Sequence, residues 1–346
     1  MAMKKLIWVP FIIILAVSLS TTIVAAQTPK VFQLKYATFL SPTQPRAPVD
    51  KEWVRRLEEQ SKGRIKTTIY WGGSLINYAD MLKGVGAGIA DIGFLGFSQG
   101  TYFINLVTNL PFVNAPTMPT QTRVYHQLYD KFPDLQKEFA KFNIRPIFSY
   151  SLPGINIHLS KKQARIPQDM KGMKIRAPVS WAEAMASVNC AVIDVPPGEF
   201  YMSLERGLVE AQVDTWLGLD SWKIKDLVKH HTVFGETGAA SMTMFAAMNL
   251  DTWNSLGPEL QKIFLDNASY SENEAMRLNQ IKVDEVLAHA KAKNDTFNHL
   301  TREEVQLWEP LFKPYIEKWI RDTESRGYPA KLIYEEAKRL VQQQMK

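Results

Sequence analysis

The sequence is poor in features that mark several large classes of protein. It contains one cysteine, Cys190, in 346 residues, which excludes an internal disulfide framework. The neighbours of Cys190 are mostly apolar and indicate a buried structural thiol rather than a reactive one. The formal net charge is +6, but no block of lysine and arginine resembles a nucleic-acid site. We therefore expect no nucleic acid among the partners of this chain.

Catalytic and metal-binding motifs are also missing. The sequence has no G-x-S-x-G, H-E-x-x-H, C-x-x-C or Walker pattern. The glycine-rich run 84–88 follows an expected helix and precedes an expected strand, the reverse of a nucleotide loop, so it indicates a helix stop. His230 and His231 follow a lysine-rich segment, 223–229, that we expect to be helical. We expect a solvated pair at that helix C-terminus, and no metal or cofactor. Paired carboxylates leave no sequence signature, so acid–base chemistry stays open.

Strong apolar character is confined to the N-terminus. Lys4 and Lys5 precede an apolar run over residues 6–17, and small residues follow as far as Ala26. This order predicts a secretory signal peptide, residues 1–26, and the run is short for the alternative, an uncleaved anchor helix. Cleavage would leave 346 − 26 = 320 residues, and the loss of two lysines would lower the charge from +6 to +4. A single core stops growing near this size, so we expect an exported chain with two lobes.

The expected secondary structure alternates between strands and helices, which predicts α/β lobes. In the first half we expect strands at 31–38, 64–70 and 90–94 and helices at 47–61 and 77–85. The second half repeats this order with strands at 174–177, 191–195 and 212–216, a helix that a Ser180–Glu183 capping box starts, and a helix from 196 that Gly207 closes. Helices are also expected at 258–293, 301–319 and 329–343, and the first is long enough to tie two lobes together.

Polar and aromatic residues follow the carboxyl ends of four expected strands, where ligands bind in open α/β sheets. Arg176 ends one of these strands, and its planar guanidinium suits a carboxylate. A purely structural bridge from Arg176 to Asp214 or Glu183 is the alternative, and the residues alone leave both open. The other candidates at the strand ends are Ser41, Phe97, Gln99, Asp214, Thr215 and Trp216.

Three segments carry more specific patterns. The first is D-M-K-G-M-K-I-R-A-P, residues 169–178. The second joins Val195-Pro196 and Glu199-Phe200-Tyr201 to the run 207–211, and the third comprises residues 61–65 and 85–93. Together they resemble the substrate-binding proteins of tripartite ATP-independent periplasmic (TRAP) transporters, the DctP family, over about residues 31–325.

The resemblance implies a two-lobe periplasmic binding protein of type II, a clamshell with hinge-spanning helices. Lobe I would comprise residues 31–153 and about 239–275, and lobe II residues 154–238 and about 276–340. Such a protein is not an enzyme. It captures an organic acid in the periplasm and delivers it to a small and a large membrane subunit for uptake driven by an ion gradient. We expect a monomer.

Residue by residue, the resemblance singles out three positions. Arg176 matches the arginine that clamps the ligand carboxylate in this family. Asp214 falls where many members carry a ligand-bonding asparagine, and Asn156 falls near a second arginine of some members. Asn156 weakens the case for a sialic acid or a dicarboxylate, and Asp214 would repel a second carboxylate. We therefore expect a monocarboxylate with an apolar or aromatic body, or a hydroxy or keto acid.

The remaining site residues have two interpretations each. Trp216, Phe97 and Trp181 would supply an apolar wall or belong to the core. Gln212 with Asp214 would suit the metal ion that some members bind beside the ligand, but we predict no metal. Closure of the lobes would bring Ser41, Phe97 and Gln99 to the ligand. The alternatives are a C4-dicarboxylate-binding TRAP protein, a solute-binding protein of an ATP-driven (ABC) transporter, an enzyme on the same fold, or a sensor.

Overall fold

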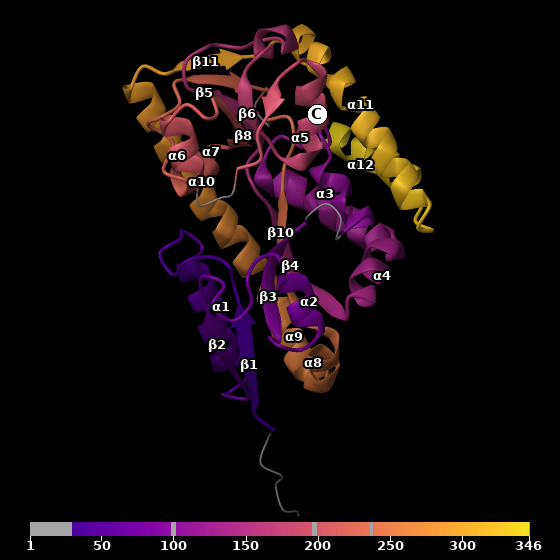
Figure 1. Ribbon diagram of the computed structural model, residues 1–346. Coiled ribbons are helices and arrows are strands. Elements are labelled where there is room, and N and C mark those ends of the chain that lie inside the picture. The colour runs from indigo at the N-terminus through magenta and orange to yellow at the C-terminus, as the bar shows by residue number, and fades with distance from the viewer. Residues whose placement is uncertain (1–29, 98–101, 196–198, 236–237, 346) are drawn as a thin grey trace, which may run out of the picture. The chain divides into compact units, whose positions relative to one another are not determined.

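The computed structural model describes residues 30–97, 102–195, 199–235 and 238–345, so the predicted signal peptide lies outside it. Val31–Lys346 form one compact unit, whose described residues contain two β-sheets (Figure 1). The first sheet has the order β2-β1-β3-β10-β4 and comprises β1 (Phe32–Ala37), β2 (Ile65–Tyr70), β3 (Ile92–Gly96), β4 (Ile144–Ser151) and β10 (Thr243–Asn249). The second has the order β11-β9-β5-β8-β6-β7 and comprises β5 (Ile155–Leu159), β6 (Lys174–Arg176), β7 (Ala191–Val192), β8 (Ala211–Thr215), β9 (His230–Val233) and β11 (Thr296–His299).

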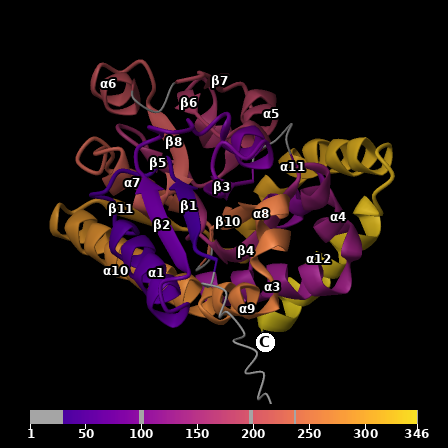
Figure 2. The same ribbon diagram turned by 90° about the horizontal axis from the view of Figure 1, so that it is seen from below.

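Helices cover both faces of the first sheet (Figure 2). Strand β10 is buried along its whole length, with Met244 and Ala246 on one face and Phe245 and Ala247 on the other. The first face packs against α1 (Ala47–Gln60), α8 (Leu250–Leu256) and α9 (Pro258–Asp266). The second packs against α2 (Met81–Gly86), α3 (Met118–Lys131), α4 (Pro133–Lys141) and the 3-10 helix η1 (Ile104–Asn109).

The second sheet is built in the same way. One face packs against α5 (Val179–Ser187) and α11 (Arg302–Glu324), with Trp181, Trp308 and Phe312 in its core. The other packs against α6 (Phe200–Glu205), α7 (Trp216–Ser221) and α10 (Ala268–Ala292). The remaining elements are η2 (Pro167–Met170) and α12 (Ala330–Gln344), and α12 packs on α3 and η1 beside the first sheet.

Two chain segments pass between the sheets side by side. The segment after β4 and the segment before β10 are joined by hydrogen bonds from Leu152 N to Met242 O (2.7 Å) and from Ala239 N to Ile155 O (2.9 Å). Helix α10 contacts both β4 and α7, so it touches an element of each sheet's layer. The sheets are therefore connected by two hydrogen-bonded chain segments and by one long helix.

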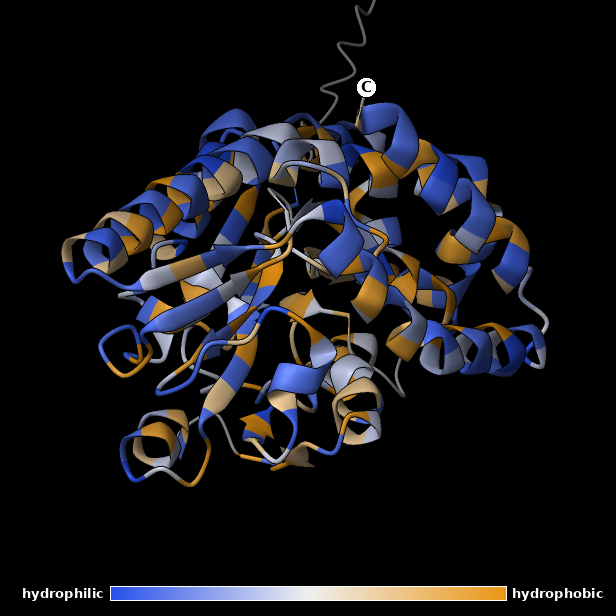
Figure 3. Ribbon diagram, turned by 90° about the horizontal axis from the view of Figure 1, so that it is seen from above, coloured by the Kyte–Doolittle hydropathy of each residue, from blue (hydrophilic) through white to orange (hydrophobic). Residues whose placement is uncertain are grey.

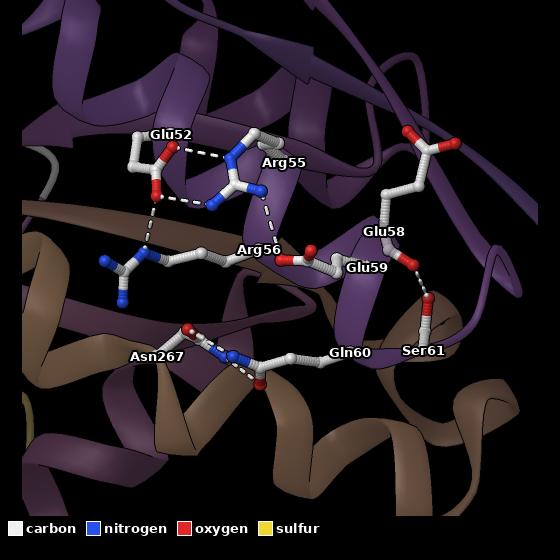
Figure 4. A network of polar contacts seen from close by, with 8 residues as sticks. All are labelled: Glu52, Arg55, Arg56, Glu58, Glu59, Gln60, Ser61 and Asn267. Carbon is white, nitrogen blue, oxygen red and sulfur yellow. Dashed lines mark hydrogen bonds and ion pairs between the residues drawn. The ribbon is translucent and has the colours of Figure 1, made fainter.

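The helix expected over residues 258–293 is two helices, because the chain breaks at Asn267. The Asn267 side chain donates to Ile263 O (2.8 Å), the last turn of α9. It also pairs with Gln60 at the end of α1, through Asn267 Nδ2 to Gln60 Oε1 (2.7 Å) and Gln60 Nε2 to Asn267 Oδ1 (3.3 Å), as Figure 4 shows. The start of α10 is thereby fixed to α9 and to α1.

Two local expectations are wrong. His230 and His231 lie in β9 rather than at a helix C-terminus, and His231 is completely buried. Lys223 adopts a positive φ of 58° after α7, and the chain then turns instead of continuing a helix. Ser180 does not cap α5, since the helix begins at Val179 with Pro178 at the N-cap and no side-chain cap.

The helices are amphipathic, and blue and orange positions alternate along them in Figure 3. Among the described helices, none has the length and apolar character needed to cross a membrane. The prediction of a buried Cys190 is confirmed, with its Sγ 3.2 Å from Met170 O. Burial raises the pKa of this thiol to about 11, so it is protonated and unreactive at neutral pH.

Candidate ligand-binding site

Arg176 is the last residue of β6 and is about one quarter exposed. Its Nη1 lies 3.4 Å from Val213 O and 3.8 Å from Asp214 Oδ2, and its Cζ lies 4.3 Å from the centre of the Phe200 ring. Within the described residues, Nε and Nη2 have no hydrogen-bond acceptor. Burial lowers the pKa of Arg176, while Asp214 and Asp194 oppose that change. Nη1 therefore contacts the protein, whereas Nε and Nη2 remain available as donors within the described residues.

Asp214, next to last in β8, is the carboxylate beside Arg176. Its Oδ2 accepts from Gln212 Nε2 (2.7 Å) and Trp222 Nε1 (3.1 Å), and its Oδ1 accepts from Thr215 N (2.7 Å). Burial raises the pKa of Asp214, and Arg176 and these donors work against the rise. Three donors therefore hold this carboxylate without Arg176, whose 3.8 Å pairing is loose by comparison.

Gly218 explains how the Asp214 carboxylate fits against α7. A Cβ at position 218 would lie 2.3 Å from the Asp214 carboxylate, a distance that real side chains do not tolerate. Thr215 Oγ1 caps α7 by accepting from Gly218 N (3.1 Å). The predicted residues Gln212, Asp214 and Thr215 are therefore brought together with Arg176, although Thr215 acts on the helix.

Asn156 lies directly opposite Asp214 in the β5–β8 pairing. Its Oδ1 accepts from Phe234 N (3.1 Å), its Nδ2 donates to Gly154 O (3.3 Å), and the residue is buried. Both ends of the amide are used by the main chain. In this arrangement one donor and one acceptor of the Asn156 amide support the backbone next to the site.

The predicted aromatic wall lies in the core. Trp181 is fully buried, with its ring 4.8 Å from Phe312. Phe97 is buried with its ring 4.9 Å from Phe245. Trp216 is buried with its ring 4.8 Å from His158. These side chains present little surface to a ligand.

The two remaining candidates belong to the first sheet's layer. Ser41 lies in the loop between β1 and α1, where its Oγ is 2.8 Å from Thr43 Oγ1 and accepts from Thr43 N (3.3 Å). Gln99 lies outside the described residues. The structure does not bring Ser41 into hydrogen-bond contact with Arg176 or Asp214.

Phe200 and Trp222 are site residues that sequence reasoning missed. Their rings are 5.0 Å apart at an interplanar angle of 69°, and they flank the Arg176–Asp214 pair from α6 and from the residue after α7. Trp222 is about one third exposed. Phe200 stood in a segment already singled out, but Trp222 becomes visible only once α7 is placed, because it follows Asp214 by eight residues.

The described residues offer little to a metal ion. They contain no cluster of three histidine, cysteine, aspartate or glutamate side chains that could hold one. Gln212, considered with Asp214 as a cation site, directs its amide nitrogen at the carboxylate. The candidate site therefore combines one loosely paired cation, one engaged carboxylate and two aromatic rings.

Comparisons with known proteins identify the family and the fold of this chain. The sequence model of the bacterial extracellular solute-binding proteins, family 7, matches residues 36–322. A monocarboxylate 2-oxoacid-binding periplasmic protein of a Nostoc species is 28% identical over 215 residues, which span 61% of this chain and 58% of that protein. The 2,3-diketo-L-gulonate-binding periplasmic protein of Escherichia coli is 24% identical over 283 residues, which span 80% of this chain and 82% of that protein.

A solved structure shows the same fold. The TRAP solute-binding protein of Rhodoferax ferrireducens, in complex with copurified benzoate, has a TM-score of 0.78 and 21% identity, covering 91% of this chain and 99% of the other. The two-sheet α/β architecture is therefore the two-lobe fold of TRAP solute-binding proteins, as expected. Since the family model covers most of its length, the chain belongs to family 7 of the bacterial extracellular solute-binding proteins, a family of transport proteins and not of enzymes.

Proposed function

We propose that this protein captures an organic acid in the periplasm for a TRAP transporter and that Arg176 anchors the acid's carboxylate. The observation that carries the proposal is the state of the guanidinium, which is three-quarters buried, loosely paired and without acceptors at Nε and Nη2 among the described residues. Arginine binds carboxylates through two parallel N–H donors, and partial burial strengthens such a pair. Membership of the family supports an organic-acid ligand.

The substrate we propose is a monocarboxylate with an apolar or aromatic body, or with a hydroxy or keto group. Asp214 places a negative charge beside Arg176, which disfavours a second carboxylate at this spot. Trp222, about one third exposed, supplies aromatic surface beside the Arg176–Asp214 pair, while Phe200 is buried and supports the guanidinium from below. The ligands named for the Nostoc and E. coli relatives are a 2-oxoacid and a diketo sugar acid, and the Rhodoferax structure contains benzoate. These ligands agree with the proposed class.

The lobes we propose follow the two sheets. Lobe I would hold residues 31–153 and about 239–275, and lobe II residues 154–238 and the chain from about 276, with α12 assigned to lobe I because it packs on α3 and η1. The signal peptide would direct the chain to the periplasm, where a monomer would deliver the acid to the two membrane subunits. Closure on the ligand would use the paired segments between the sheets as its hinge.

A thermal-shift and calorimetry screen of the mature protein tests the proposal. The panel contains benzoate, mandelate, pyruvate, a sugar acid, C4-dicarboxylates, neutral sugars and an amino acid. A ligand at about 100 times its dissociation constant stabilises a protein by about 2.7 kcal/mol, a shift of several degrees. Monocarboxylate binding that Arg176→Ala abolishes and Arg206→Ala retains is the expected result, since Arg206 is exposed on the same part of the chain.

Two outcomes would change the assignment. Binding of C4-dicarboxylates alone would overturn the monocarboxylate class but keep the anchor. Binding of acids that persists in Arg176→Ala, or binding of neutral sugars only, would remove Arg176 from the site.

A further inference from the structure

Two buried histidines lie below the candidate site, and neither takes part in it directly. His158 on β5 and His231 on β9 are directly paired in the second sheet, and both are completely buried. Their Nδ1 atoms are 2.9 Å apart. His158 Nε2 lies 3.2 Å from the main-chain oxygen of Asp214, and His231 Nε2 lies 3.5 Å from Asp295 Oδ2. These contacts form one chain of three polar contacts that runs from Asp214 to Asp295.

This chain of polar contacts has one proton too few to make all three contacts hydrogen bonds. A carbonyl oxygen and an ionised carboxylate only accept, so each of the three contacts needs its own hydrogen. Two neutral imidazoles carry two N–H groups in total. If His158 donates to Asp214 O, then His231 must donate to His158, and His231 Nε2 meets Asp295 with a lone pair. If His231 donates to Asp295 instead, the Asp214 oxygen loses its donor. A third proton, shared by His231 and Asp295, satisfies all three contacts.

The surroundings of this chain of polar contacts favour its two-proton form at neutral pH. Burial lowers the pKa of His158 far below its usual value and lowers that of His231 to about 4, where His230 adds to the effect. Burial also raises the pKa of Asp295, against the charges of His289, Lys229, His230 and Lys293. The 3.5 Å contact is the longest of the three, as expected where a hydrogen is missing.

The groups that face the chain come from every element around it. Trp216 of α7 and Phe297 of β11 enclose the two rings, and the ring of His299 stacks on Phe297. His289 of α10 and Lys293, the residue after α10, also pair with Asp226, so a second carboxylate shares their charge. On β8 the only charged neighbour among the described residues is Asp214, which contributes its carbonyl here and its carboxylate to Arg176.

We propose that His158, His231 and Asp295 are positioning residues for the anion site, and that uptake of a third proton by this chain fixes Asp214 and tightens binding of the acid. The inference rests on the proposed function of Arg176. When the chain is complete, the Asp214 carbonyl keeps its donor all the time, so the site is better preorganised. The third proton also removes one negative charge from the sheet, which favours an anion.

Asp295→Asn provides a direct test because an asparagine amide donates where the carboxylate cannot. Its N–H would meet His231 Nε2 and complete the chain without a third proton. We expect this variant to bind benzoate about fivefold more tightly than wild type at neutral pH, the lower end of typical coupling between sites. As the pH falls towards about 5, the difference between the two proteins should narrow, because the wild type begins to take up the third proton. The titrations run from about pH 5 to about pH 8, where benzoate stays ionised.

Asp226→Asn is the matched control. It removes the same charge from a carboxylate that contacts His289 and Lys293, but it lies outside the chain. Equal tightening in both variants would show a general charge effect and overturn the positioning role. Weaker benzoate binding in Asp295→Asn, with an intact fold by circular dichroism, would also overturn it.

Nitrogen-15 NMR of the histidine rings tests the chain without any ligand. At neutral pH the expected spectrum has the two protons exchanging between the two arrangements, so that His158 Nε2 is only partly protonated. On acidification His158 Nε2 and His231 Nδ1 become fully protonated, and a further proton joins His231 and Asp295. A bare His158 Nε2 at every pH would overturn the inference, whatever the protein binds. Correct tautomers in a protein that binds no acid would contradict the proposed function instead, so the two failures are distinct.

Discussion

Two arginines, Arg46 and Arg176, each lie beside a carboxylate and aromatic rings, yet their surroundings differ. Arg46, at the start of α1, is 4% exposed, with Nη2 3.0 Å from Asp50 Oδ1 and 3.1 Å from Ser271 Oγ. Its Cζ lies 4.6 Å from the ring centre of Phe94, and Phe148 and Tyr150 also face it. Arg176 is 24% exposed and sits 3.8 Å from a carboxylate that other donors hold.

Arg46 Nε and Nη1 also lack an acceptor among the described residues, so spare donors do not separate the two arginines. The shorter pairing distance and deeper burial of Arg46 mark a structural ion pair, whereas Arg176 is the more accessible cation. Burial lowers and Asp50 raises the pKa of Arg46, and the net change is upward, so the pair stays charged in the core. The pKa of Arg176 changes in the opposite direction, because burial lowers it more than the neighbouring carboxylates raise it. A guanidinium that its own protein pairs poorly is the one that gains most from an incoming anion.

The largest expected effect is on the Arg46 pair. Arg46→Ala would leave Asp50 buried and unpaired, so we expect a loss of about 3–5 kcal/mol in the free energy of unfolding. Urea denaturation measures it. The double variant Arg46→Met with Asp50→Leu should recover most of the loss, because it removes both charges. Equal instability of the single and double variants would contradict a structural ion pair.

Arg176→Ala should show the opposite pattern. We expect it to weaken binding of the acid by about 2–5 kcal/mol because a charge-assisted pair is lost. The free energy of unfolding should change little, since Asp214 keeps three other donors. Calorimetry and urea denaturation on the same sample separate the two quantities. A large loss of stability without loss of binding would show that Arg176, like Arg46, forms a structural ion pair.

Asp214→Asn sharpens the comparison at the carboxylate. We expect it to tighten monocarboxylate binding by about 1 kcal/mol, since a competing charge beside Arg176 disappears. In the wild type the raised pKa of Asp214 has the same consequence on acidification. Asp214 should take up its proton above the usual range of about 4, so affinity should rise as pH falls towards that range. An affinity that falls on acidification would contradict the competition between Asp214 and the ligand carboxylate for Arg176.

The smallest effect concerns the aromatic ring below each arginine. Phe200→Leu should weaken binding by about 0.5–1 kcal/mol, because it removes the cation–π contact with Arg176, and it should also lower stability because the ring is buried. Phe148→Leu, the matched change beside Arg46, should lower stability and leave binding unchanged. Thermal unfolding with and without benzoate distinguishes these outcomes.

Much of the fold could be predicted because local periodicity determines it. Helix α1 was expected at 47–61 and spans Ala47–Gln60, and β2 was expected at 64–70 and spans Ile65–Tyr70. Strand β10 was not predicted, because burial on both faces replaces the alternation of a half-exposed strand by a continuous apolar run. His231 was misplaced for a related reason, since a histidine buried by sheet pairing has no local signature.

The sequence by itself determined the β-α order of the lobes, the buried cysteine and the strand end that carries Arg176, since each follows from neighbours within a few residues. It also determined the family, through motifs that lie close together in the chain. Only the tertiary structure decided that Asp214 is held by Trp222, that Phe200 lies below Arg176 and that Trp181 belongs to the core. These arrangements depend on strand pairing and on packing between distant segments, which no local pattern encodes.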